Sequence, residues 1–373
     1  MNTKIENVKG VNLGNWLVLE KWMSPELFEG TDAEDEFYLP TKLSKEVYEA
    51  RIRTHRNEYI TERDFQILKG MGINVVRIPL PYFFFGDRAP FIGCVEWMDK
   101  AFNWAETYGL QILLDLHTAP DGQNGFDNGG ICGICCWCKE PEEVEFVYTV
   151  LERLAERYGT RKGLFGIEIL NEPVLEEVWP HMHIQDRYDP IDKEKAAMST
   201  GIPMAFLRDF YEKAYDRIRA ILPKEKYVVF HDAFMIDAWK DFMRDDKYEN
   251  VILDTHLYMM MLSEEDRKDP ENACRKVTAH WKEQITEMQQ YFPVVVGEWC
   301  ISNPMVHGMS DPEEIKEAYR KVSLMETDAW KAGSGYFYWS YKLNFDTVNG
   351  GIPHDSGWDF GRSNALGWFC EAE

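Results

Sequence analysis

The chain has 373 residues, and its 41 basic and 64 acidic side chains give a formal net charge of −23 at pH 7. Such an acidic chain repels phosphate backbones and anionic lipids, so nucleic acids and membrane surfaces are poor partners. Hydrophobic residues make up 45% of the sequence and aromatic residues 14%, which is enough for the core of one large barrel or of two domains.

Short apolar runs alternate with stretches of helical periodicity. The runs predict strands at 10–18, 73–80, 111–117, 164–172, 226–232, 251–258, 294–300 and 335–342. Helices are predicted between them at 60–72, 97–109, 145–159, 206–222 and 312–333. Eight strand–helix units favour a parallel (β/α)₈ TIM barrel of the α/β class, formed as a single domain over residues 1–373. No GxGxxG motif follows the first run, which argues against a nucleotide-binding sheet.

Two connections are much longer than the others, at 119–143 after the third predicted strand and at 174–203 after the fourth. Long loops at the C-terminal ends of barrel strands are where such folds build their sites. Polar residues also occur where most of the apolar runs stop. These residues are Arg77, His117, Asn171, Glu172, His256, Tyr258, Glu298 and Trp339. We expect them to meet at one end of the barrel.

Side-chain alternation then predicts two facing carboxylates. Glu172 shares a face with Glu168 on its strand, and Glu298 shares a face with Val296, because side chains alternate with a period of two. A pair of carboxyl groups across a pocket is what glycoside hydrolysis requires, one neutral to protonate the leaving oxygen and one charged to attack the anomeric carbon. We expect Arg77 to keep Glu298 ionised, while burial and charge repulsion keep Glu172 protonated. Glu168 and Asp115, one pleat deeper, are expected to be buried partners of Arg77 or of a histidine.

These motifs resemble glycoside hydrolase family 5, a family of retaining β-glycanases and β-glucosidases. "NEP" after the fourth strand and "GEW" after the seventh match its two catalytic signatures. The resemblance implies that Glu172 is the acid/base and Glu298 the nucleophile of a double displacement. It also implies that Asn171 binds the sugar 2-OH and that Arg77 and Tyr258 orient the nucleophile. Further implied roles are a sugar platform for Trp339 and hydroxyl or acid/base contacts for His117 and His256.

A narrower resemblance extends to the exo-β-1,3-glucanases of yeast within that family. It rests on "GVNLGNWLVLEKWMSPELFEG" and "DLHTAPDGQNGFDNGG". It implies that Glu20, Asp127 and Asn128 bind hydroxyls of the terminal glucose and close one end of the cleft. Phe126 matches half of an aromatic clamp at the entrance, whereas the other half falls near Met261, which is not aromatic. That departure leaves the preference for the leaving group open.

The sequence therefore predicts a retaining β-glucosidase or exo-β-1,3-glucanase that releases glucose from the non-reducing end of short β-linked oligosaccharides or small β-glucosides. No metal or organic cofactor is expected, and the oligomeric state is left open. The alternatives are an endo-β-1,4-glucanase or mannanase, or a diglycosidase that acts on plant glycosides. A non-catalytic carbohydrate-binding protein is disfavoured because both carboxylates are present. A thiol or metal protein built on the cysteine loop is a further class.

The eight cysteines are too few for a disulfide scaffold in a chain of this length. Cys132, Cys135, Cys136 and Cys138 form a cluster that is expected to pack its loop, with a disulfide or metal staple as the alternative. His181 and His183 have metal-pair spacing but are expected to be loop residues without a metal. Because residues 1–16 contain no apolar signal segment, we expect a cytoplasmic protein, or a secreted one if the natural chain is longer.

Overall fold

The structure is a computed structural model that describes residue 5 and residues 7–259, 266–306, 308–344 and 355–372. Eight parallel strands pair in chain order and close into a barrel, because the eighth also pairs with the first. The strands are β1 (Val8–Asn12), β2 (Val75–Leu80), β3 (Gln111–Leu116), β4 (Leu164–Glu168), β5 (Tyr227–His231), β6 (Val251–His256), β7 (Val294–Glu298) and β8 (Gly335–Tyr338). The (β/α)₈ barrel predicted from the sequence is confirmed.

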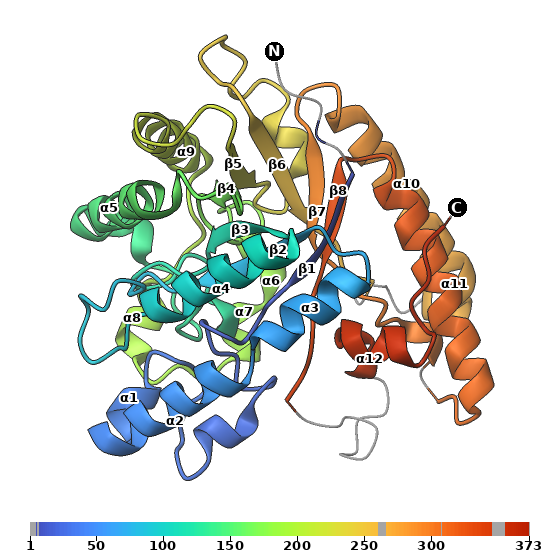
Figure 1. Cartoon of the computed structure of the whole chain (residues 1–373), viewed down its shortest axis with the longest axis horizontal. Helices are drawn as coiled ribbons and strands as arrows, with labels where there is room; N and C mark the ends of the chain where they lie inside the picture. Colours follow the sequence, from blue (N-terminus) through green and yellow to red (C-terminus); the bar gives the residue numbers. More distant parts are fainter. Residues whose placement is uncertain (1–4, 6, 260–265, 307, 345–354, 373) are drawn as a thin grey trace.

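Helices surround the strands, with α5 and α9 on one flank and α10 and α11 on the other (Figure 1). The helices are α1 (Leu39–Lys42), α2 (Lys45–Glu58), α3 (Glu62–Gly70), α4 (Val95–Tyr108), α5 (Pro141–Tyr158), α6 (Trp179–Met182), α7 (Ile184–Arg187), α8 (Lys193–Met198), α9 (Met204–Arg219), α10 (Pro270–Met288), α11 (Pro312–Trp330) and α12 (Phe360–Ala365). Among the described residues, no helix is both long enough and apolar enough to span a bilayer.

The barrel interior is layered by chemistry. Its lower layer takes one buried apolar side chain from each strand: Val8, Val75, Leu113, Phe165, Val229, Ile252, Val295 and Phe337. Two residues further along β2, β3 and β6, the same inward face carries Arg77, Asp115 and Asp254. A register irregularity between β3 and β4 pairs Asp115 with Glu168, which therefore joins this polar layer. The upper half of the barrel is thus polar and lies next to the C-terminal ends of the strands.

Glycine is required at one position of this polar layer. A Cβ atom on Gly297 of β7 would lie 1.9 Å from Oδ2 of Asp254. The missing side chain leaves room for the Asp254 carboxylate, while the Gly297 carbonyl accepts a hydrogen bond from the Asn12 side chain at 2.8 Å. Any other residue would displace a buried charge.

Three local expectations were wrong. The first strand covers Val8–Asn12 and not residues 10–18. Arg77 lies at the third position of six in β2, so it does not mark a strand end. β4 ends at Glu168, and the backbone at Glu172 adopts a left-handed φ of +42°, so strand alternation does not extend to Glu172. Beyond Glu168, the Ile169 N–H still donates to the Val229 carbonyl of β5, and the Asn171 N–H donates to the Leu116 carbonyl of β3.

Candidate active site

Arg77 is the centre of the buried polar layer. Its guanidinium donates two hydrogen bonds to Glu168, at 2.7 and 3.0 Å, and lies 3.2 Å from Asp115. It also donates to Asn171 at 2.7 Å and to Glu298 at 2.9 Å. The expected roles of Glu168 and Asp115 as buried partners are therefore confirmed. Burial raises the pKa of Glu168 well above its ordinary value. Glu168 can therefore bind a proton, which reduces the negative charge around the single guanidinium of Arg77.

Glu298 ends β7 and points into the barrel mouth. Nη1 of Arg77 donates to its Oε1, and the Tyr258 hydroxyl donates to its Oε2 at 2.8 Å. The carboxylate is buried and held on both oxygens. It can therefore attack along one defined direction, as a nucleophile must.

Glu172 reaches the same mouth from the irregular segment after β4. Nδ1 of His256 lies 2.8 Å from its Oε1, and the Asn128 side-chain amide donates to its Oε2 at 2.7 Å. The same His256 nitrogen lies 3.5 Å from Oε2 of Glu298. Oε1 of Glu172 and Oε2 of Glu298 are therefore separated by at most the sum of these two distances. Nδ1 of His256 thus lies within 3.5 Å of both carboxyl groups.

The protonation expected for this pair was wrong for the free protein. Burial raises the pKa of Glu172, but the hydrogen bond and charge of His256, together with Asn128, outweigh it and lower that pKa below its ordinary value. Burial and the neighbouring Glu172 raise the pKa of Glu298 against the effects of His256 and Arg77. Both carboxylates lie close to the same cation, the ring of His256. The sequence pattern did not predict this shared contact.

His256 is that cation. Nε2 of its ring faces Asp254 at 3.3 Å while Nδ1 faces Glu172, so a proton is stabilised on each nitrogen. Burial disfavours the charged ring, but the carboxylates of Glu298, Asp254 and Glu172 hold the pKa of His256 well above its ordinary value. In the free protein, the proton that an acid catalyst needs is therefore held one hydrogen bond away from Glu172.

His117 lies beneath the cavity mouth and contacts both Asn171 and Trp339. Nδ1 of His117 faces Asp115 at 2.5 Å, and Nε2 lies 3.4 Å from the Asn171 amide nitrogen. The His117 ring stacks against Trp339 at 5.6 Å with an interplanar angle of 8°. Trp339 follows β8 and lines the cavity, so its indole is placed as a flat wall for a sugar ring.

A cavity of about 650 Å³ opens above the two carboxylates. Of the predicted site residues, Glu20, Phe126, Asp127, Asn128, Glu172, His256, Tyr258, Glu298 and Trp339 line it. Glu20 accepts a hydrogen bond from the Trp22 indole at 2.7 Å, and burial with the charge of Asp127 raises its pKa well above the ordinary value. Arg77, His117 and Asn171 lie beneath the cavity surface. Met261 lies outside the described residues.

The comparisons with known proteins agree with this geometry. The family model described as cellulase (glycosyl hydrolase family 5) matches residues 42–344. The chain belongs to glycoside hydrolase family 5. It is therefore a glycosidase that hydrolyses O-glycosyl bonds with retention of configuration, as the sequence predicted.

Curated relatives within family 5 also agree with the narrower resemblance. A probable glucan 1,3-beta-glucosidase A of Emericella nidulans is 36% identical over 308 residues, which cover 80% of this chain and 68% of that protein. A glucan 1,3-beta-glucosidase of Candida oleophila is 31% identical over 388 residues, which cover 90% and 84%. Among solved structures, a rutinosidase from Aspergillus niger superposes with a TM-score of 0.78 at 20% identity, over 99% of this chain and 100% of that one.

Sequence reasoning missed several cavity residues of this family 5 enzyme. They are Trp22, Met182, Arg187, Tyr188, Phe234 and Trp358. Trp358 packs against the rings of Trp22 and Tyr258, at 5.5 and 5.1 Å. The Tyr188 hydroxyl donates to Asp127 at 2.7 Å. All six lie in irregular segments or very short helices, where no periodicity indicates direction. For Met182, Arg187 and Tyr188, the available signal was the length of the loop at 174–203.

The cysteine cluster packs its loop, as expected. Cys132, Cys135 and Cys136 are buried free thiols, and burial raises the pKa of Cys132, Cys135 and Cys138. The described residues show no disulfide within the cluster. His181 and His183 are exposed and lie on or beside α6, outside any described group of potential metal ligands.

Potential metal ligands do meet at the active site itself. Glu172, His231 and His256 form one group, and Glu168, Asp254 and His256 form another. Nδ1 of His231 accepts the Ala233 N–H at 3.0 Å, which leaves the proton on Nε2. Since His256 is held as a cation, neither group offers three free lone pairs, and we assign no metal to them. The expectation that no cofactor is needed stays a prediction.

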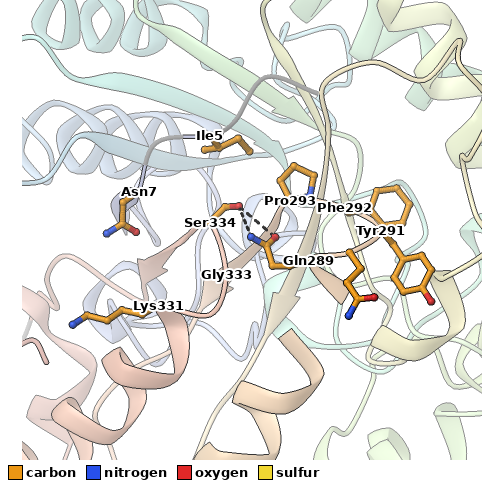
Figure 2. A pocket seen from close by; sticks show the side chains of 10 residues that line it. Ile5, Asn7, Gln289, Tyr291, Phe292, Pro293, Lys331, Gly333 and Ser334 are labelled. Atoms are coloured by element: carbon orange, nitrogen blue, oxygen red, sulfur yellow. Dashed lines mark hydrogen bonds between the residues drawn. The ribbon is translucent and has the colours of Figure 1, made fainter. Parts of the chain in front are cut away.

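A second cavity, of about 530 Å³, opens at the N-terminal ends of the strands (Figure 2). Gln289 crosses it and donates a hydrogen bond to the Ser334 hydroxyl at 3.2 Å, so these polar groups satisfy each other. Among the described residues, no carboxylate lines it. It lacks the chemistry for hydrolysis, and the carboxylate pair remains the candidate active site.

Proposed function

We propose that this enzyme is a β-glucosidase of the exo-β-1,3-glucanase type, which removes glucose from the non-reducing end of short β-glucosides. The observation that carries the proposal is the buried carboxylate of Glu20, which lines the same cavity as Glu172 and Glu298 beside the indoles of Trp22 and Trp358. Polar groups that close one end of a cleft favour exo action over endo action. The names of the curated relatives support this glycone and linkage.

In the first step, Glu298 attacks the anomeric carbon and forms an α-linked glycosyl ester. Arg77 and Tyr258 release their hold on its charge as the ester forms. Glu298 is the carboxylate that contributes most to the raised pKa of His256, so its neutralisation weakens the affinity of His256 for its proton. As Glu298 attacks, the proton shifts from Nδ1 of His256 to Glu172 across 2.8 Å, and Glu172 passes it to the glycosidic oxygen while the C–O bond breaks and the alcohol departs.

In the second step, Glu172 is ionised and acts as a base. It removes a proton from water, and the resulting hydroxide attacks the anomeric carbon of the ester from the side that the leaving group vacated. Glu298 is the leaving carboxylate and regains its charge. The regained charge raises the affinity of His256 for a proton, and the site returns to its initial state.

The two roles can be separated by the reactivity of the leaving group. Glu172→Gln should lower kcat/KM on alkyl β-glucosides by about 10²–10⁴-fold, because their leaving groups need protonation. The same variant should form the glycosyl ester at a near-normal rate from 2,4-dinitrophenyl β-glucoside, whose leaving group needs none. Glu298→Gln should lose both activities. If Glu172→Gln hydrolysed alkyl glucosides as fast as the wild type, the assignment would be wrong.

A diglycosidase is the second candidate, because a rutinosidase shares the whole fold and the loop at 174–203 adds residues to the cavity mouth. A panel of laminaribiose, cellobiose, gentiobiose, an aryl β-glucoside and an aryl β-rutinoside separates the two. Release of free glucose from laminaribiose supports the first proposal. Release of an intact disaccharide from the rutinoside, without glucose, supports the second. The cytoplasmic location stays a prediction.

A further inference from the structure

One wall of the cavity mouth is formed by the loop after β4. Phe126, Val174 and Ile184 form a small apolar cluster with Met182, Tyr188 and Phe234 packed against it. Phe126 precedes Asn128, which donates to Glu172, and Val174 follows Glu172 by two residues. The wall therefore lies on the acid/base side of the scissile bond. That is the side on which the leaving group departs.

Arg187 is the single lysine or arginine among the described residues that line the cavity. It ends α7, is exposed, and its guanidinium carbon lies 5.3 Å from the ring centre of Phe126 and 5.5 Å from that of Tyr188. Among the described residues, its guanidinium has no hydrogen-bond or ion-pair partner, although Asp186 and Asp189 are close in sequence.

The guanidinium is pre-oriented for an anion. The guanidinium lies over the rings of Phe126 and Tyr188, which leaves its N–H groups available to a carboxylate. Deeper in the cavity, Glu20, Asp127, Glu172 and Glu298 would repel a negative group. An anionic substrate is therefore tolerated only if its charge sits at the rim, beside Arg187, with its apolar part against the Phe126 wall.

We propose that Arg187 binds a carboxylate on an aromatic leaving group, so that β-glycosides of aromatic acids are preferred substrates. This inference rests on the proposed function, since it needs a sugar in the cavity and a leaving group on the Glu172 side. Arg187 determines specificity and takes no part in bond breaking. The aromatic ring packs against Phe126 and Met182 while the carboxylate accepts a bidentate hydrogen bond.

The test compares 4-carboxyphenyl β-glucoside with 4-carbamoylphenyl β-glucoside, which has the same shape without the charge. The measured quantity is the ratio of kcat/KM for the acid to that for the amide. Intrinsic leaving-group differences cancel when this ratio is compared between variants. Arg187→Gln should lower it by about fivefold, the size of an exposed ion pair, and Arg187→Lys should lower it less. High salt should lower the wild-type ratio towards that of Arg187→Gln.

Arg63 provides the matched control. It is exposed on α3 and has no hydrogen bond or ion pair among the described residues, but it does not line the cavity. Arg63→Gln should leave the ratio unchanged. A ratio that is equal in the wild type and in Arg187→Gln would overturn the role of Arg187, even with both substrates hydrolysed.

A wild type that hydrolyses neither compound would instead count against the glucoside assigned as substrate. In that case the acid and the amide are compared by their inhibition constants as competitive inhibitors. 4-Hydroxybenzoate and 4-hydroxybenzamide then compete with whichever β-glycoside the enzyme does hydrolyse. Stronger inhibition by the acid, lost in Arg187→Gln, would still support the anion site, and equal inhibition would reject it.

Discussion

Asn128 donates its side-chain amide to Oε2 of Glu172 at 2.7 Å, so it contacts the proposed acid/base directly. Its own carbonyl oxygen accepts from Asn124 at 3.1 Å, which fixes the amide orientation. The preceding residue, Asp127, is held by the Tyr188 hydroxyl. A contact chain thus links the loop after β4 to the acid/base through the loop after β3. Asn128 has a positioning role besides any contact with a sugar hydroxyl.

Removing this hydrogen bond should impair acid catalysis. Asn128→Ala should lower kcat/KM on alkyl β-glucosides by about 10–100-fold, the usual cost of a lost hydrogen bond to a charged group. The pKa of Glu172 should rise, because the amide hydrogen bond helps to lower it. Asn272→Ala, an exposed asparagine on α10, is the control. An Asn128→Ala enzyme with wild-type kinetics and an unchanged pH profile would show that this hydrogen bond is irrelevant to turnover.

His256 should determine the width of the pH profile of kcat/KM. The acidic limb reports ionisation of Glu298, and the alkaline limb reports loss of the proton shared by His256 and Glu172. The raised pKa of His256 places the wild-type alkaline limb above the ordinary histidine value of 6.5. In His256→Gln, the alkaline limb is set by Glu172 alone and moves to lower pH. The acidic limb moves to higher pH, because the pKa of Glu298 loses a cation that lowers it.

The control for that profile is His181→Gln, a substitution at an exposed loop histidine. It should leave both limbs in place. An alkaline limb that does not move in His256→Gln would mean that the proton comes from another group.

Arg77 should be important for stability as well as for catalysis. Arg77→Lys removes the fork that holds Glu168, and leaves Glu168 and Asp115 buried without adequate partners. We expect a loss of about 3–5 kcal/mol in the free energy of unfolding, measured by urea denaturation. Arg217→Lys disrupts a half-exposed pair with Glu152 and should cost less than about 1 kcal/mol. Equal losses in the two variants would contradict the buried network.

Glu326 should make the protein less stable as pH rises. This α11 carboxyl is buried, neither oxygen has a hydrogen-bond partner among the described residues, and burial raises its pKa well above 4.5. The folded state therefore binds the proton more tightly than the unfolded state. The free energy of unfolding falls as pH rises from about 4.5 through the folded-state pKa.

Glu326→Met should remove that dependence. The variant should gain about 1–3 kcal/mol over the wild type at pH 8, and less at pH 4. Glu317→Met, on the exposed face of the same helix, should gain nothing at either pH. A wild-type advantage at pH 8 in thermal or urea unfolding would show that Glu326 is stabilised by its surroundings.

The fold and the two proposed catalytic carboxylates follow from local patterns. Strand–helix alternation predicts the barrel, and barrel strands aim their C-terminal ends at one face, so "NEP" and "GEW" place Glu172 and Glu298 together. Side-chain alternation predicts that Arg77 and Asp115 share the interior, whereas Glu168 joins them through the register irregularity between β3 and β4. The barrel and Glu298 depend on regular elements, where sequence position fixes direction, whereas Glu172 lies in the irregular segment after β4 and was predicted from its motif.

Other features depended on contacts between irregular segments far apart in the chain. No sequence pattern indicates that Asn128 contacts Glu172, that Tyr188 holds Asp127, or that the Arg187 guanidinium has no carboxylate partner among the described residues. The protonation of Glu172 and Glu298 also differed from the expectation, because His256 contacts both carboxylates. Sequence alone determined the barrel and the two carboxylates that reach its mouth. The tertiary structure decided which of them share protons and charges, since hydrogen bonds and electrostatic energies depend on distances that the order of residues does not specify.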